Sequence, residues 1–301
     1  MFFRRFRAKW WTKRMIKKNN QTTKAVNCES FIHKTDRATL EALKKIPLFD
    51  TVCGKLMSLI NEPQRNILDM SSKIKITKEQ IPRVYNMVES ICKKIGIEMP
   101  NLYLELNREP NACTYGTKKF TITVNSGLLE CLEDDELYAV LAHECGHIAC
   151  QHVLYHTMGA FILDGGSKGL KRLENIFSSG IVGSIISATV ESSLELAYYH
   201  WNRCSELSAD RIAVICCGGA DPVIETMMRL AGGTTHIDSE INRDLFIAQA
   251  EEYKRLTEEN KIDKALEYWL TCGYSHPLLA VRAFEAQKFA NSEEFKSIIV
   301  S

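Results

Sequence analysis

Two histidines and a glutamate in the stretch LAHECGHIAC, residues 141–150, have the types and spacing of a metal site. On a helix, residues i and i+4 share one face about 6 Å apart, so the imidazoles of His143 and His147 can converge on one ion. Glu144 projects about 100° around the helix from His143, where it can reach a metal-bound water without binding the metal. The motif predicts half of a zinc site with its own general base; two histidines that share a helix face are the alternative.

A third ligand must come from elsewhere in the chain. Glu206 and Asp210 are also four residues apart, in RCSELSADRIAVICCGG, and Glu206 would complete a two-histidine, one-carboxylate set that leaves a position for water. Asp210, one turn further on, is placed to accept a hydrogen bond from the outer nitrogen of a ligand histidine. The alternatives are an acidic pair on a solvated helix face and Cys204 as a thiolate ligand, although Cys204 points away from Glu206.

Two further features accompany the first motif. His152 and His156 form another i, i+4 pair, but they lie more than a turn beyond His147, so we expect them to cap or pack. Gly146 costs up to about 1 kcal/mol against alanine inside a helix, which indicates that a substrate or a neighbouring backbone comes close there.

The elements that position these residues are mainly helical. Apolar residues at helical spacing place the two motifs inside helices, one within 126–158 and the other within 181–217. A third helix is expected over 77–97, with Thr77 as its N-cap and Gly96 as its end. Between these helices, NLYLELN and KFTITVN alternate apolar and polar residues, which predicts a small antiparallel sheet. The predicted fold class is therefore α+β, mainly α.

Composition limits the class and the compartment. The 301 residues are 45% hydrophobic and 25% charged, as expected for one large globular domain. Eleven cysteines without a secretory signal indicate free thiols in a reducing, cytoplasmic compartment. The longest uncharged run of interest, residues 175–190, is too short and too polar for a membrane-spanning helix, which needs about 20 apolar residues.

The first residues of the chain differ from the rest. Nine of the 38 basic residues and none of the acidic ones fall within the first 28 positions, so the remainder carries a net charge of −8. Residues 1–18 combine aromatic and basic side chains, a composition suited to an anionic membrane surface. The alternatives are a frayed tail or an arm packed on the body. The acidic body and the missing nucleic-acid motifs predict no nucleic-acid partner.

Four motifs in a fixed order resemble a known family. NACTYG at 111–116, VNSGLLECLEDDELYAVLAHECGHI at 124–148, RCSELSAD at 203–210 and HPLLAVR at 276–282 resemble the motifs of HtpX-like and CAAX-prenyl-endopeptidase-like zinc metallopeptidases. These are gluzincins, with HExxH on one helix and ExxxD on a later one. The resemblance implies a helical, zincin-like metalloprotease domain with a small sheet at the active-site cleft.

The resemblance implies a role for each matched residue around the metal. His143, His147 and Glu206 would bind one Zn²⁺ per chain, and Glu144 would be the general base. Asp210 would support a ligand histidine.

The outlying motifs imply further roles. Asn111 and Ala112 would belong to an edge strand to which an extended substrate adds as another strand. His276 would face the scissile carbonyl, and Arg282 matches the arginine that follows it. From the residues alone, Asn111 reads as a turn residue and His276 as a loop histidine before Pro277.

The predicted function is that of a zinc-dependent metalloendopeptidase, a hydrolase that acts on peptides or proteins. The alternative is a zinc-binding protein on the same fold that binds peptides or acts as a scaffold without cleaving. Integral members of the family have membrane-spanning helices, some of them between the zinc motifs, whereas this chain has a glycine-broken segment, residues 158–190. We expect four parts: a leader and linker at 1–34, a helical part at 35–95, the metallopeptidase domain at 96–290 and a tail at 291–301.

Overall fold

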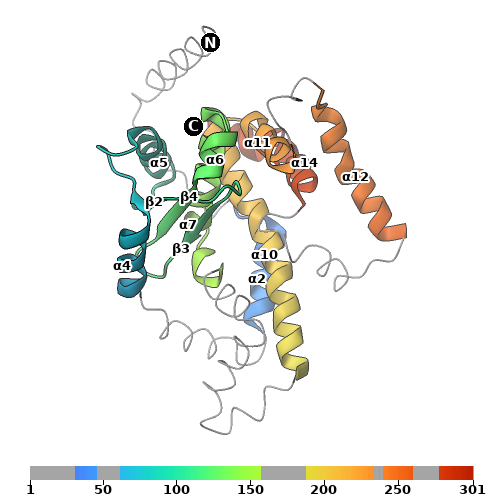
Figure 1. Cartoon of the computed structure of the whole chain (residues 1–301). Coiled ribbons are helices and arrows are strands. Elements are labelled where there is room, and N and C mark those ends of the chain that lie inside the picture. The colour runs from blue at the N-terminus through green and yellow to red at the C-terminus, as the bar shows by residue number, and fades with distance from the viewer. Residues whose placement is uncertain are drawn as a thin grey trace.

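The computed structural model of the chain describes residues 31–45, 62–156, 188–232, 237, 240–259 and 278–300, with only the backbone described for 188–196 and 300. Three features singled out from the sequence lie outside these residues, namely the leader at 1–18, most of the segment at 158–190, and His276. Within the described part, helices surround one four-stranded sheet (Figure 1). This arrangement confirms the α+β, mainly α class.

The sheet is mixed rather than antiparallel. Its strands are β1 (Ile74–Lys75), β2 (Asn101–Glu105), β3 (Ala112–Tyr115) and β4 (Thr121–Asn125), in the order β1-β2-β4-β3. The two strands expected from the sequence, β2 and β4, are parallel, with Leu102 opposite Ile122. The antiparallel prediction is wrong for this pair because a further strand, β3, lies between them in the sequence. Since β3 and β4 form a hairpin, β4 runs in the same direction as β2 and leaves β3 at the edge.

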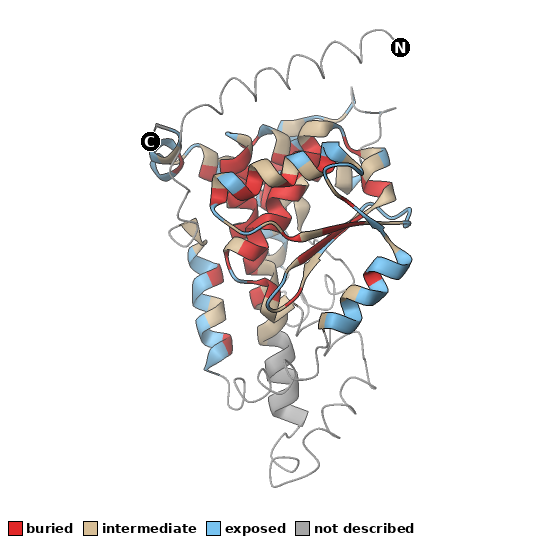
Figure 2. Ribbon diagram, turned by 90° about the vertical axis from the view of Figure 1, so that its left-hand side faces the viewer, coloured by how far each residue is buried: buried red, intermediate tan, exposed pale blue. Residues whose placement is uncertain are grey.

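The two faces of the sheet differ in chemistry because side chains alternate along a strand. Leu102, Ile122 and Val124 lie in the main hydrophobic core. The opposite face is polar, and α4 (Glu62–Ser72) packs there through its one buried residue, Asp69, which accepts a hydrogen bond from Tyr115 Oη over 2.7 Å. Figure 2 shows the buried residues gathered in the helical layers and the sheet, and a largely exposed α4.

Helix α5 (Pro82–Ile95) begins later than the sequence suggested. Thr77 does not cap it; its hydroxyl instead accepts hydrogen bonds from the N–H groups of Glu79 and Gln80 in a preceding turn. Proline suits the first helical position because it lacks an N–H, and it keeps the preceding residue out of the right-handed helical region. The predicted end is confirmed, since Gly96 adopts the left-handed conformation at φ 73°.

Two helices form the centre of the molecule. After the short α6 (Ser126–Cys131), α7 (Asp134–Ala149) begins with a capping box between Glu133 and Glu136, and most of its residues are buried. The long α10 (Ala188–Cys217) crosses α7, and α2 (Lys34–Lys44) packs beside α10 (Figure 1). Because α7 and α10 carry the two sequence motifs, their crossing decides the geometry of the site.

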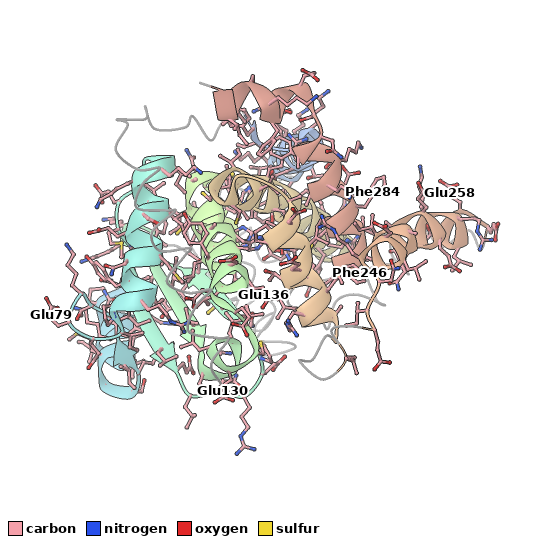
Figure 3. All side chains as sticks on the ribbon, turned by 90° about the horizontal axis from the view of Figure 1, so that it is seen from above. Glu79, Glu130, Glu136, Phe246, Glu258 and Phe284 are labelled. Atoms are coloured by element: carbon pink, nitrogen blue, oxygen red, sulfur yellow. The ribbon has the colours of Figure 1, made fainter. Side chains whose placement is uncertain are left out.

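The remaining helices are α11 (Asp221–Ala231), α12 (Arg243–Glu259), α14 (Leu279–Ala290) and α15 (Glu293–Val300). They pack on this pair or on one another: α11 contacts α7, α14 contacts α10, and α12 and α15 contact α14. Glu136 of α7, labelled in Figure 3, forms an ion pair with Arg229 of α11, with Nη2 and Oε1 3.3 Å apart. Phe246 of α12 and Phe284 of α14 pack against the core, whereas Glu258 lies on the outer part of α12 (Figure 3). In α15, the buried Phe295 packs its ring on Phe289.

Candidate metal centre

Backbone contact between α7 and α10 sets the distance between the two motifs. A Cβ atom added at Gly146 would lie 3.0 Å from both the Cα and the O atom of Ala209, and 3.1 Å from Cβ of Ile212. A larger residue would therefore push the helices apart. The expectation that glycine allows a close approach is confirmed, and the approaching group is a neighbouring backbone.

Three buried donor atoms converge where the helices cross. Nε2 of His143 lies 3.0 Å from Nε2 of His147, and the Glu206 carboxylate oxygens lie 3.5 and 3.3 Å from these two nitrogens. Each of the three residues is at most 5% exposed. A tetrahedral Zn²⁺ with ligands at about 2.0 Å separates its donor atoms by about 3.3 Å. The described residues contain this one group of three suitable side chains, and its spacing fits zinc.

The balance of buried charge also favours a bound cation. The carboxylates of Glu144, Glu206 and Asp210 are 2–3% exposed, and the permanent cation that contacts the last two is Arg282. Acidic groups therefore outnumber permanent cations around the donor atoms. Because buried charges are stable only when paired or bound to a metal, this donor set suits a bound cation.

His143 is supported directly by a carboxylate. Its Nδ1 atom lies 2.9 Å from Oδ1 of Asp210, and Arg282 binds both oxygens of Asp210 at 2.7 and 2.8 Å. A further guanidinium nitrogen of Arg282 lies 2.8 Å from Oε2 of Glu206. Burial alone would lower the pKa of His143, but Glu206 and Asp210 outweigh burial and raise it to about 10. The surroundings of His143 therefore strongly favour positive charge.

His147 is supported in another way. Its Nδ1 atom lies 3.0 Å from Nδ1 of His152, and Nε2 of His152 lies 2.9 Å from Oδ2 of Asp36. Burial, together with the neighbouring His143, lowers the pKa of His147 even though Glu206 opposes this change. The expectation that His152 caps or packs was incomplete, because His152 forms a hydrogen bond with a candidate ligand.

Glu144 lies between the donor atoms and the edge strand. The hydroxyl of Thr114 in β3 donates a hydrogen bond to Oε2 of Glu144 over 2.5 Å. Ala112 is buried in the same strand, and the carbonyl of Asn111 accepts a hydrogen bond from the N–H of Asn125. Asn111 directly precedes β3 and Ala112 begins it, and Thr114 brings this strand against Glu144 of the candidate metal centre. Cys204, the alternative ligand, lies near Thr35 and Thr39 of α2 instead.

Three side chains at the centre were not assigned there from the sequence. Thr114 follows Ala112 by two residues, so strand periodicity would have put both on one face. His152 lies close to HExxH in the sequence, but no helical spacing connects it to His147. Asp36 lies 116 residues before His152 and gives no local signal. His276 lies outside the described residues.

Two buried histidines and a glutamate beside an edge strand are the arrangement expected of a metallopeptidase. Comparison with known families makes the class specific. Residues 78–290, more than two thirds of the chain, match the family model described as Peptidase family M48. The chain belongs to this family, which confirms the resemblance to HtpX-like enzymes and the assignment as a metal-dependent hydrolase of peptide bonds.

Individual relatives agree with the family. The chain is 28% identical over 278 residues to the Plastoglobule-localized metallopeptidase 48, chloroplastic, of Arabidopsis thaliana, which covers 92% of this chain and 76% of the relative. It is 24% identical over 193 residues to a Protease HtpX homolog of Pelotomaculum thermopropionicum, covering 58% of this chain and 68% of the relative. A Protease HtpX homolog of a Sulfurihydrogenibium species is 37% identical over 97 residues, about a third of each chain.

No helix in the described part of the chain combines the length and the apolar character needed to cross a bilayer.

Proposed function

We propose that this metallopeptidase is a zinc-dependent endopeptidase in which His143, His147 and Glu206 bind one Zn²⁺ per chain and Glu144 is the general base. The observation that carries this proposal is the convergence of three buried donor atoms, 3.0 to 3.5 Å apart, beside a further buried carboxylate. Zinc is the ion that this donor set favours, because two imidazoles and one carboxylate with an open position are typical of catalytic zinc sites.

The chemistry follows from the positions of the side chains. When bound, Zn²⁺ would polarise the scissile carbonyl and lower the pKa of water from about 15.7 to about 7. Glu144 takes a proton from the attacking water and delivers it to the leaving amine nitrogen, so no covalent enzyme intermediate is needed. The hydrogen bond from Thr114 holds the Glu144 carboxylate in orientation. The family resemblance gives His276 the task of stabilising charge on the carbonyl oxygen.

The substrate side of the proposal concerns β3. This strand pairs with β4 along one side and forms an end of the described sheet. An extended peptide can add to such an edge through main-chain hydrogen bonds, which requires no particular side chain of the substrate. Asn111 and Ala112 would then bind the peptide backbone, and Thr114 would connect the same strand to the general base. This arrangement suits peptide or protein substrates in an extended conformation.

A substitution of the general base tests the proposal. Glu144→Gln in the full chain should lower peptide hydrolysis at least about 100-fold, because general acid–base catalysis typically contributes a factor of 10² to 10⁴. Zinc content should stay at one ion per chain, since Glu144 is not a ligand. The exposed Glu130 on α6 supplies the control, and Glu130→Gln should cleave like the wild type.

Cleavage of a library of unfolded proteins, followed by mass spectrometry, gives the readout. Full activity of Glu144→Gln would remove Glu144 as the base. A zinc-loaded wild type that cuts nothing in the library would favour the alternative, a zinc protein that binds peptides without cleaving them.

A second part of the proposal concerns location. Residues 1–18 would dock the enzyme on an anionic membrane surface from the cytoplasmic side, because eight basic and several aromatic side chains occur there. One relative is named as localised to plastoglobules. Co-sedimentation with anionic vesicles should be strong for the full chain and weak for a chain without residues 1–18. Equal sedimentation of both would exclude docking by this segment.

A further inference from the structure

One buried carboxylate near the metal centre has no part in the proposed mechanism. Asp36, in the first turn of α2, is 1% exposed. It accepts hydrogen bonds from Trp201 Nε1 over 3.0 Å and from Ser208 Oγ over 2.5 Å, and its Oδ2 lies 2.9 Å from Nε2 of His152. Burial raises the pKa of Asp36, but contacts with His152, Ser208 and Trp201 outweigh burial and lower it. All three neighbouring groups can donate a hydrogen bond, which suits a carboxylate anion.

The hydrogen bonds connect this anion to His147. If Nε2 of His147 faces the metal, Nδ1 of His147 carries the proton and donates it to Nδ1 of His152 over 3.0 Å. The proton of a neutral His152 is then on Nε2, where it is donated to Asp36. Each ring nitrogen of the two histidines is either a donor or an acceptor in this series of hydrogen bonds. The negative charge of Asp36 therefore fixes the tautomer of both rings.

The end of α7 brings His152 back onto His147. The N–H of Gln151 bonds to the carbonyl of Ile148, and the N–H of His152 bonds to the carbonyl of His147. These two bonds define a Schellman motif, in which the second residue after the cap lies over the third residue before it. Gln151 adopts the left-handed conformation at φ 61°, a position that usually holds glycine. The side-chain contact that accompanies such motifs is usually apolar, whereas here it is a hydrogen bond between two imidazoles.

We propose that Asp36 and His152 are positioning residues of the metal centre, which act on the metal through the ring of His147. This inference rests on the proposed function for the position of the ion. The two hydrogen bonds that join His147 to His152 and His152 to Asp36 form a relay. This relay raises the basicity of His147 and fixes its orientation, as outer partners of ligand histidines commonly do. Because Asp36 precedes the family match at 78–290, helix α2 becomes part of the metal centre.

Zinc affinity of the full chain tests the relay without any measurement of peptidase activity. His152→Phe keeps a ring of similar size but removes both hydrogen bonds, and Asp36→Asn removes the charge. Each should weaken zinc binding roughly 10- to 100-fold in competition with a chelator, the range typical of such outer partners. His152→Gln should recover part of the loss, because an amide also offers one acceptor and one donor.

A buried carboxylate elsewhere supplies the matched control. Asp69 is 3% exposed and binds Tyr115 and Lys73 on the far face of the sheet. Asp69→Asn should leave zinc affinity at the wild-type value, even if it lowers stability. The absorption spectrum of the Co²⁺-substituted protein should change in His152→Phe and Asp36→Asn, because the geometry at His147 is altered, and should not change in Asp69→Asn.

The double variant separates a relay from a general loss of stability. If Asp36 acts through His152, adding Asp36→Asn to His152→Phe should weaken zinc binding no further. Wild-type affinity in His152→Phe, or additive losses in the double variant, would overturn the proposal. If Asp36→Asn does not fold, the comparison of His152→Phe with His152→Gln still decides it. A wild type that binds zinc but cleaves nothing would refute the proposed function and leave the relay intact.

Discussion

The two histidines of the candidate metal centre are supported by different parts of the molecule. His143 contacts the carboxylate of Asp210 directly, and Arg282 neutralises that carboxylate. His147 reaches a carboxylate only through a second imidazole, and that carboxylate, Asp36, is bound by neutral donors.

The first arrangement raises the pKa of His143, whereas the second leaves the pKa of His147 lowered by burial. Each proposed ligand imidazole is thus oriented by a carboxylate. Asp210 contacts His143 directly, whereas the ring of His152 separates Asp36 from His147. The direct support comes from residues inside the family match, and the relayed one depends on a helix outside it.

The largest effect is expected where charge is in direct contact. Asp210→Asn leaves Arg282 buried without its main partner and turns an amide N–H toward the guanidinium. Breaking a buried ion pair typically costs about 3–5 kcal/mol, so the free energy of unfolding of the chelator-treated protein should fall by this amount. Urea denaturation measures it.

The exposed pair of Arg255 and Glu259 provides the comparison for this stability measurement. Glu259→Gln should cost less than about 1 kcal/mol, as for other exposed ion pairs. A loss below 1 kcal/mol in Asp210→Asn as well would show that the direct support is energetically no different from a surface pair.

A smaller effect is expected when the two supports are compared by their influence on zinc binding. Asp210→Asn should weaken zinc binding by about 100-fold and Asp36→Asn by about 10-fold, the two ends of the range for outer partners of ligands. The reason is distance, since the charge of Asp36 acts through one additional ring. Chelator competition on the two variants measures the ratio. Equal losses, or a larger loss in Asp36→Asn, would reverse the order of the two supports.

The smallest effect is expected for a ring that packs on the relay without a hydrogen bond to it. The ring of His156 lies 4.7 Å from that of His147, but its Nε2 atom bonds to Ser205 Oγ. Burial lowers the pKa of His156 well below its usual value, so His156→Phe removes no charge. Zinc affinity should change less than about threefold, and stability should fall by about 1 kcal/mol for the lost hydrogen bond. A tenfold loss of zinc affinity would assign His156 to the relay.

Features of the fold and the site that depend on one short stretch of sequence could be predicted. The fold class follows from local periodicity, and a close approach at Gly146 follows from the cost of glycine inside a helix; both are confirmed. The pairing of His143 with His147, and of Glu206 with Asp210, could likewise be predicted from helical spacing. The roles of these residues at the metal and the division of the chain into four parts stay predictions.

Features that depend on several segments were missed or wrong. The direction of β4 depends on β3, which apolar periodicity did not reveal and which only the family resemblance implied, through Ala112. The start of α5 was decided by the missing N–H of Pro82 rather than by the capping hydroxyl of Thr77. The relay required a Schellman turn with a non-glycine residue and a carboxylate 116 residues earlier in the chain. Neither has a signature in a short window of sequence.

The contact of Gly146 with Ala209 has a consequence for how the donor atoms are held. Where two helices meet at backbone distance and are surrounded by a large apolar core, their spacing is fixed by packing, as at Leu141, Cys145 and Ile212. If the site binds Zn²⁺ as proposed, packing rather than the ion holds the donor atoms in place. Small zinc domains fold only when the metal binds, whereas removal of the ion from this protein is expected to leave the fold intact.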